Sequence, residues 1–182
     1  YFFTIKKPFY PTENVAMPNI ETLEKVRAKN ILINPISKNS NLFSVNTLNY
    51  SEFRDIDLSI MSSVRENIVN LDLSYSKITD SIFFNLKYYT NLTVLKLNNT
   101  NILGENIDEL SQLKNLKRIY LVNTKFDAQN TEKLIHLKYL EKVYLFQENR
   151  ILETPLKSSK DFEEIFDFGN YSLNNSKQNK ES

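Results

Sequence analysis

The sequence predicts an α/β fold in which short repeated units form a right-handed coil, with one parallel sheet and helical crossovers. Four segments share one template and begin at Ile68, Leu92, Leu116 and Leu140, each 24 residues after the last. In each, apolar and polar residues alternate as in a strand, and apolar residues at helical spacing follow the first three. Self-similarity at a fixed period is typical of folds that stack one structural unit on the next.

The shared template is Leu-x-x-Leu-x-Leu-x-x-Asn/Thr-x-Leu/Ile, which is the signature of the leucine-rich repeat. Its copies are Ile68–Ile78, Leu92–Ile102, Leu116–Phe126 and Leu140–Glu148. The last copy departs from the template, because Glu148 replaces the expected Thr and the next apolar residue, Ile151, follows three positions later instead of two. The motif therefore predicts a leucine-rich-repeat solenoid and leaves the function open.

Strand alternation assigns each side chain of a repeat to one face of the sheet. Leu95 and Leu97 are expected in the interior, whereas Val94, Lys96 and Asn98 are expected to point outward. The same rule predicts burial of the motif leucines Leu71, Leu73, Leu95, Leu97, Leu121 and Leu145. A polar column of Ser76, Thr100 and Thr124 follows the strands, where a hydroxyl can satisfy neighbouring backbone groups.

Parallel strands need long crossovers, and the sequence supplies them with helical spacing. The apolar pairs and triplets that predict these crossovers are Ile82/Leu86, Ile107/Leu110/Leu113 and Leu134/Leu137. Asp80 and Asp127 stand where helix N-caps are expected.

The predicted organisation has five parts: an extended linker or cap edge at 1–19, an N-terminal αβ cap at 20–67, four repeats at 68–151, a closing segment at 152–173 and a disordered tail at 174–182. Within the cap, helical spacing is expected from Ile20 to Val26 and again from Phe53 to Met61, with Ile56 and Ile60 as apolar positions. Two strands are expected between these helices, at 30–33, where Pro35 stops the strand, and at 41–45.

Composition fits one globular domain, because the 182 residues are 41% hydrophobic and 25% charged. A net charge of +1 gives no reason to expect nucleic acid or an acidic membrane surface as a partner. The chain has no cysteine, so it offers no disulfide, no thiolate nucleophile and no haem-attachment motif. Apolar runs such as Tyr1–Phe3 are no longer than four residues, which is too short to insert into a bilayer. A first residue other than Met is compatible with an export signal or anchor upstream.

Catalytic and metal chemistry find little support, so we expect no enzymatic activity and no cofactor. His136 is the only histidine, and its place between Ile135 and Leu137 on a crossover indicates a structural or solvated role. The acidic pairs Asp108–Glu109 and Glu163–Glu164 are adjacent, which separates their side chains on a helix. Metal-binding motifs are missing from the sequence, and its two glycines are too few for a phosphate-binding loop.

The outward side chains of the later repeats form the candidate partner-binding surface. It consists of Arg118, Tyr120, Val122, Lys142, Tyr144 and Phe146. Tyrosine with arginine is the composition of binding hot spots, and neighbouring strands ~4.8 Å apart place Tyr120 beside Tyr144. The alternative is that the two rings only cover the sheet.

Three segments carry a resemblance to a known family: 28–46, 65–74 and Val143–Gln147, which reads Val-Tyr-Leu-Phe-Gln. Together they resemble the leucine-rich-repeat region of bacterial membrane-anchored proteins that carry a c-type cytochrome domain. The resemblance covers about Leu23 to Ile151. It implies a periplasmic or otherwise extracytoplasmic location, and a neighbouring haem domain that this chain does not contain.

Two functions follow as hypotheses. The first is a non-enzymatic module that docks a protein partner, such as the adjacent haem domain of its own polypeptide. The second is an exported protein that binds carbohydrate or a cell-surface glycan, with exposed tyrosine rings stacked on sugars.

Overall fold

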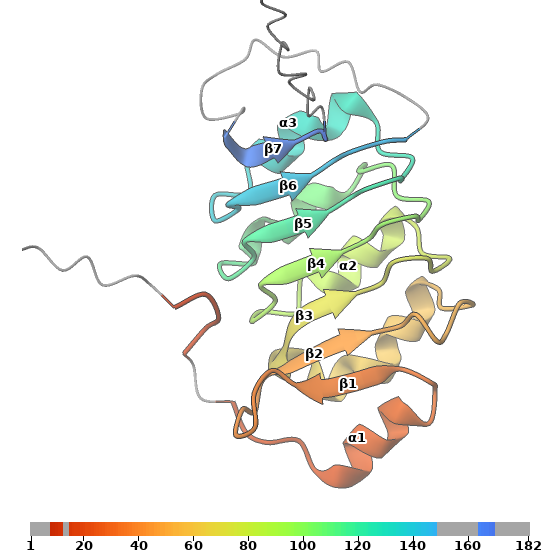
Figure 1. The fold of residues 1–182 in the computed structure, drawn as a ribbon, viewed down its shortest axis with the longest axis vertical. Helices are drawn as coiled ribbons and strands as arrows, with labels where there is room; N and C mark the ends of the chain where they lie inside the picture. Colours follow the sequence, from red (N-terminus) through yellow and green to blue (C-terminus); the bar gives the residue numbers. More distant parts are fainter. Residues whose placement is uncertain (1–7, 13–14, 149–163, 170–182) are drawn as a thin grey trace, which may run out of the picture.

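The computed structural model describes residues 8–12, 15–148 and 164–169. They form an α/β fold with a seven-stranded, mostly parallel sheet and helices between the strands (Figure 1). The elements are α1 (Ile20–Arg27), β1 (Leu32–Pro35), β2 (Phe43–Asn46), the 3-10 helix η1 (Asp55–Asn67), β3 (Ile68–Asp72), η2 (Asp80–Ile82), α2 (Phe83–Leu86), β4 (Val94–Lys96), η3 (Ile107–Gln112), β5 (Arg118–Tyr120), η4 (Ala128–Asn130), α3 (Thr131–Ile135), β6 (Lys142–Tyr144) and β7 (Phe166–Asp167).

The strands lie in the sheet in the order in which they occur in the chain. Strands β2 to β7 pair in parallel, but β1 is antiparallel to β2, so the prediction of one wholly parallel sheet was wrong at this edge. The reason is the length of the connection. Only residues 36–42 join β1 to β2, which is too short for a parallel crossover, and Ile36 N donates to Leu42 O at 3.0 Å across the turn.

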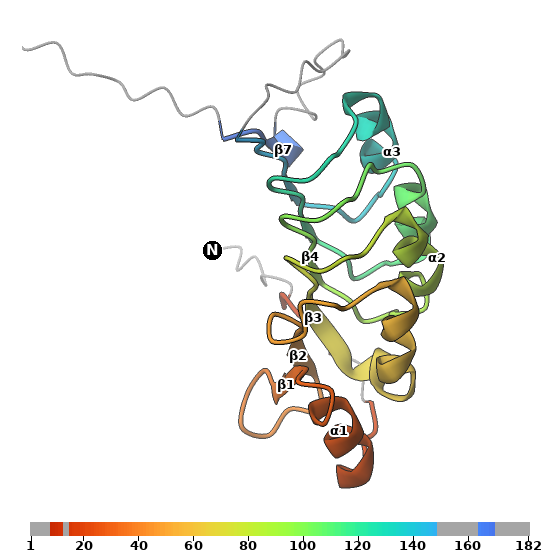
Figure 2. The same ribbon diagram turned by 90° about the vertical axis from the view of Figure 1, so that its right-hand side faces the viewer.

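The helices of the repeated units lie on one side of the sheet (Figure 2). The motif leucines belong to the buried hydrophobic core. The predicted burial of these leucines is confirmed, since all six are at most 1% exposed: Leu71, Leu73, Leu95, Leu97, Leu121 and Leu145. We call the opposite side of the sheet, which carries the outward side chains of the strands, the open face.

The helix η1 differs from the prediction for the cap. Helical spacing predicted Ile56 as an apolar position of the cap helix, but Ile56 is 77% exposed, and the buried apolar residues are Leu58, Met61 and Val64. These three follow each other at every third position because the element is a 3-10 helix with three residues per turn.

Two columns of polar side chains satisfy backbone carbonyls, the first within each unit and the second between successive units. The predicted hydroxyl column is confirmed: Ser76, Thr100 and Thr124 each donate to the carbonyl three residues earlier, at 2.6, 2.6 and 3.0 Å. The second column, which the sequence analysis missed, contains asparagines. Their side-chain amides donate to backbone carbonyls of preceding segments, as Asn91 does to Glu66 O at 2.7 Å, and its members are Asn41, Asn67, Asn91 and Asn115.

Of the two predicted N-caps, one is confirmed and one is wrong. The Asp127 carboxylate accepts from Gln129 N at 2.9 Å and caps η4. The cap of η2 is Thr79, whose hydroxyl accepts from Ser81 N. Asp80 instead accepts from the backbone of the next unit.

The predicted closing element lies partly within the described residues. Its residues Phe166–Asp167 form β7, which extends the sheet by one parallel strand beside β6. The predicted tail at 174–182 and residues 152–163 and 170–173 of the closing segment lie outside the described residues.

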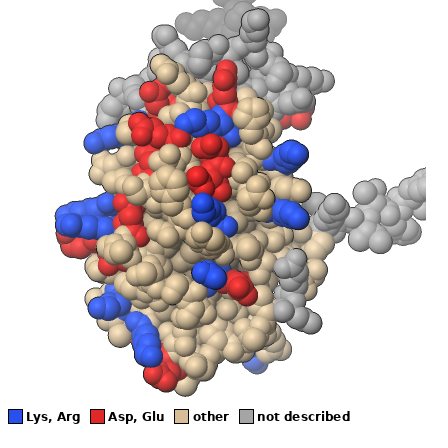
Figure 3. Space-filling model, turned by 180° about the vertical axis from the view of Figure 1, so that it is seen from behind, with Lys and Arg blue, Asp and Glu red and all other residues tan. Residues whose placement is uncertain are grey.

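Charge on the helix side is mixed. Blue and red side chains are interspersed in Figure 3, with ion pairs such as Lys87–Glu109 at 2.8 Å among them. In the part of the chain that the structure describes, no helix has the length and apolar character needed to cross a membrane.

Candidate protein-binding face of the sheet

The open face is organised around one column of side chains that follows the strand register. Asp72, Lys96, Tyr120 and Tyr144 are aligned on β3, β4, β5 and β6. Lys96 Nζ lies 3.6 Å from a carboxylate oxygen of Asp72 and 5.6 Å from the centre of the Tyr120 ring. We call these four residues the central column. It is charged at its amino-terminal end and aromatic at its carboxy-terminal end.

The two tyrosines at the aromatic end form a parallel stack. Their ring centres are 4.3 Å apart and their planes differ by 12°, which confirms the predicted side-by-side placement. Both rings are half-buried. Burial raises the pKa of the Tyr120 hydroxyl, and the neighbouring Tyr144 adds to this rise. Both effects favour a neutral phenol, which presents a flat, uncharged surface with a polar end, suited to binding protein or sugar.

The predicted rim cations are engaged by other parts of the chain. The Arg118 guanidinium lies 4.7 Å from the centre of the Phe9 ring, and Lys142 Nζ donates to Glu164 O at 3.3 Å. The structure therefore brings Arg118 and Lys142 to the predicted face but does not leave them as free charges. Sequence spacing gave no signal for these contacts, because neither partner belongs to the repeats.

The remaining predicted residues lie where the strands end. Val122 is half-buried, and its N–H donates to the Asn98 side chain at 2.9 Å. Phe146 is 40% exposed, and its ring lies so close to Gly169 that a Cβ at that glycine would come within 2.7 Å of it. Residues 164–169 therefore cover part of the predicted patch from its carboxy-terminal side.

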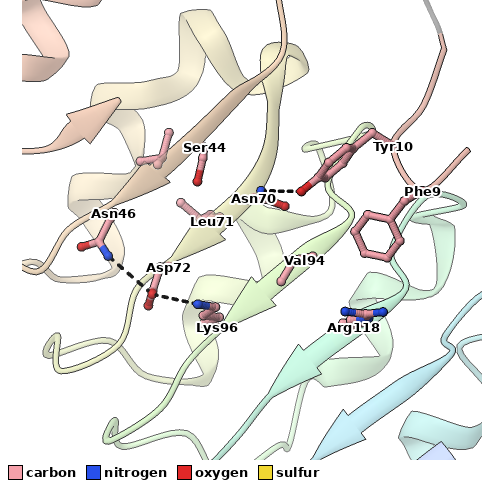
Figure 4. A pocket seen from close by; sticks show the side chains of 11 residues that line it. Phe9, Tyr10, Ser44, Asn46, Asn70, Leu71, Asp72, Val94, Lys96 and Arg118 are labelled. Carbon is pink, nitrogen blue, oxygen red and sulfur yellow. Dashed lines mark hydrogen bonds and ion pairs between the residues drawn. The ribbon is translucent and has the colours of Figure 1, made fainter. Parts of the chain in front are cut away.

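A second, polar part of the open face lies over β2 to β4, where the sequence analysis singled out no site. A cavity of about 260 Å³ opens there between the sheet and residues Phe9 and Tyr10 (Figure 4). Its polar lining includes Asn46, Asn70 and Asp72, and Asn46 Nδ2 lies 3.5 Å from Asp72 Oδ2.

Residues 8–12, which we call the N-terminal segment, form the outer wall of this cavity. The Tyr10 hydroxyl accepts from Asn70 Nδ2 at 2.9 Å, while Phe9 stands above Arg118 (Figure 4). The prediction for this region was an extended linker or cap edge. The sequence does contain one local signal for these contacts, because two aromatic residues stand between Pro8 and Pro11.

The described residues give no evidence for a catalytic or metal centre on this face. His136 is exposed and follows α3, on the helix layer rather than on the open face. No group of three His, Cys, Asp or Glu side chains among the described residues is placed to hold a metal ion.

Comparison with protein-family models and with curated proteins found no match for this sequence. The fold and the open face are therefore the basis for a functional assignment.

Proposed function

We propose that this chain is a non-enzymatic protein-interaction module, built as a leucine-rich-repeat solenoid whose right-handed coil presents the open face to a protein partner. The strand register supports the solenoid. Residues 24 positions apart lie side by side on successive strands, as Asn70, Val94, Arg118 and Lys142 do. Such stacking gives an extended binding surface in which each unit contributes a few side chains.

The observation that supports protein binding most directly is the N-terminal segment itself. It contacts the open face through aromatic rings, one hydroxyl and one carbonyl. A polypeptide segment is thus already accommodated on this surface. The Tyr120–Tyr144 stack lies next to it on the same face and offers the amphipathic rings that interfaces favour.

The partner we propose is the haem domain of the same polypeptide, in a periplasmic or otherwise extracytoplasmic, membrane-anchored protein. This rests on the resemblance to the leucine-rich-repeat region of membrane c-type cytochrome proteins. The chain would hold no cofactor of its own, and the haem would be bound entirely by the neighbouring domain. Its role would be to dock that domain, through side chains of the open face.

Two experiments test this proposal. The coding sequence upstream of Tyr1 is expected to encode an anchor or export signal and a Cys-x-x-Cys-His motif. The haem domain it encodes is then titrated into this chain by calorimetry, with Tyr120→Ala/Tyr144→Ala and, as a control, Tyr139→Ala on an exposed tyrosine outside the stack. Saturable binding that only the double variant loses supports the proposal. An upstream sequence without the motif removes the cytochrome assignment.

A second candidate function, carbohydrate binding, is favoured by the polar cavity. Asn46, Asn70 and Asp72 provide amide and carboxylate groups beside the Phe9 and Tyr10 rings, a combination suited to sugar hydroxyls and ring faces. Saturation-transfer NMR with monosaccharides tests this candidate. Contact signals that disappear in Asp72→Ala favour carbohydrate, and a lack of signals at millimolar sugar opposes it.

A further inference from the structure

The N-terminal segment is held by side-chain contacts at two places. At the first, the Phe9 ring lies 5.0 Å from Lys117 Nζ and 4.7 Å from the Arg118 guanidinium carbon, and Lys117 Nζ donates to Pro8 O at 3.2 Å. At the second, Asn70 Nδ2 donates to the Tyr10 hydroxyl at 2.9 Å. A cation above an aromatic face is attractive because the ring face carries partial negative charge.

The receptor side of these contacts is fixed by the sheet and not by the segment. Lys117 N and Arg118 N both donate to Thr93 O, at 2.9 and 3.1 Å. Lys117 O in turn accepts from Glu141 N and Lys142 N, at 2.8 and 3.0 Å. The backbone that carries the two cations is therefore fixed without the segment, and Lys117 Nζ also lies 3.6 Å from a carboxylate oxygen of Glu141, which directly precedes β6. We call Lys117 and Arg118 the cation pair.

The segment is a poor fit to this site in two respects. Among the described residues, no backbone–backbone hydrogen bond joins residues 8–12 to the sheet. The Asn70 Oδ1 atom is buried without a hydrogen-bond partner, beside the Nδ2 atom that binds Tyr10. An unsatisfied buried acceptor is unfavourable, and a ligand that donates to it, or exposure to water, would remove this penalty. The segment therefore leaves one hydrogen-bonding group of the site unused, which another ligand could engage.

We infer that the cation pair and Asn70 form a binding site for an extended protein segment that places an aromatic ring next to a proline, and that residues 8–12 are an internal competitor for it. This rests on the proposed function, in which the open face binds a protein partner, and it adds the chemistry of the bound segment. The partner's ring replaces Phe9 on the cation pair. Its neighbouring polar group hydrogen-bonds to the Asn70 side chain in place of Tyr10.

The test uses the full chain and a probe copied from its own segment, acetyl-Pro-Phe-Tyr-Pro-Thr-amide. The probe is titrated into the 15N-labelled wild-type chain and into the variant Phe9→Ala/Tyr10→Ala, with the side-chain amide of Asn70 as the NMR reporter. A tethered segment acts at an effective concentration of about 1 mM, so for a probe with a dissociation constant of about 0.25 mM the variant is expected to bind about fivefold more tightly.

Two controls define the contacts. A probe with Ala in place of Phe is expected not to bind, because no ring then contacts the cation pair. The same loss is expected when Lys117→Gln and Arg118→Gln are added to the variant. Glutamine keeps much of the length of each side chain while removing the positive charge that the ring requires.

A second reporter follows displacement in the otherwise intact chain. The sequence contains no tryptophan, so Phe9→Trp introduces a single indole at the occupied position. Unlabelled probe is expected to shift its emission to longer wavelength as the indole leaves the cation pair for water. The Lys117→Gln/Arg118→Gln substitutions are expected to give the same shift without any probe.

The outcomes separate the two proposals. Equal probe affinity in wild type and in Phe9→Ala/Tyr10→Ala overturns internal competition, and the lack of binding to that variant at millimolar probe overturns the site. Either result leaves intact the titration with the haem domain, which depends on Tyr120 and Tyr144. Loss of that titration alone would instead contradict the proposed function.

Discussion

Asp80 connects two successive units through a single carboxylate. It is 7% exposed and accepts hydrogen bonds from the N–H groups of Leu103, Gly104 and Glu105, at 2.8, 2.6 and 3.0 Å. Gly104 has a φ of +89°, and a Cβ there would lie 2.3 Å from the Phe126 ring, so the turn needs glycine. The sequence places an acidic residue before a crossover, but the N–H groups that donate to it lie more than 20 residues away, which local spacing does not reveal.

Removal of the Asp80 carboxylate is expected to destabilise the chain strongly. In Asp80→Ala three buried or half-buried N–H groups lose their acceptor, which should lower the free energy of unfolding by about 3 kcal/mol. Asp127→Ala, which removes an exposed N-cap, should cost about 1 kcal/mol. Urea unfolding followed by circular dichroism gives both values. Equal losses would show that the Asp80 bonds contribute no more than a cap.

The burial of Tyr89 is expected to cause a specific loss of stability at alkaline pH. Its side chain is 2% exposed and donates to Leu58 O at 3.2 Å, and burial raises the pKa of its hydroxyl well above the ordinary 10.0. Below pH 10.0 the phenol is neutral in both the folded and the unfolded chain. As the pH rises further, Tyr89 ionises first in the unfolded chain. The free energy of unfolding therefore falls with rising pH until the pH reaches the pKa of the folded state.

The variant Tyr89→Phe separates this effect from general alkaline unfolding. At neutral pH it should cost about 1 kcal/mol, because Leu58 O loses its donor. Between about pH 9 and about pH 11 it should lose less stability than the wild type, because the titrating group is gone. Urea unfolding across this range measures the slopes, and parallel slopes would exclude Tyr89 as the cause.

At the scale of elements, the order and parallel pairing of β3 to β6 could be predicted from the repeat, but the antiparallel β1 and the helical geometry of the cap could not. In η1 the side chains of Leu58, Met61 and Val64 face the core, at a spacing of three. The sequence also offers Ile56 and Ile60 at a spacing of four, which fits an α-helix equally well. Packing against neighbouring elements selects between the two patterns, and this information is not local.

Substitutions in η1 test its orientation directly. Leu58 is 2% exposed, so Leu58→Ala should lower the free energy of unfolding by about 2–5 kcal/mol through lost apolar burial and a cavity. Ile56 is 77% exposed, so Ile56→Ala should change it by about 0.5 kcal/mol at most. Thermal or urea unfolding of the two variants is sufficient. A larger loss of stability in Ile56→Ala than in Leu58→Ala would instead support the α-helical orientation, in which Ile56 faces the core.

At the scale of the whole molecule, the fixed 24-residue period explains why most of the open face could be predicted. Residues at equivalent positions lie side by side on parallel strands, so the Tyr120–Tyr144 pair follows from counting. The contacts that close this face could not be predicted in this way. Lys117 and Pro8 are 109 positions apart, and no repeated pattern relates them. Such contacts depend on how non-repeating segments pack onto the finished sheet.

Substitutions in the Tyr120–Tyr144 stack test whether this face binds a partner or whether the rings only cover the sheet. A double-mutant cycle of Tyr120→Ala and Tyr144→Ala should give a coupling energy of about 1 kcal/mol in unfolding, the usual value of an aromatic pair. The chain should stay folded, because the six motif leucines beneath are untouched. If the rings are interface anchors, the double variant should also bind the proposed haem-domain partner at least about tenfold more weakly per folded molecule.

The exposed Tyr139 provides the matched control, and Tyr139→Ala should change neither stability nor binding appreciably. Coupling in stability with unchanged affinity would identify the stack as sheet cover. Tyr75 would then be the next position to substitute: it is 61% exposed, with a φ of +62°, in the loop that follows β3. A loss of binding in Tyr75→Ala would indicate that the partner binds the loops that follow the strands and not the open face, because the Tyr75 side chain belongs to one of those loops.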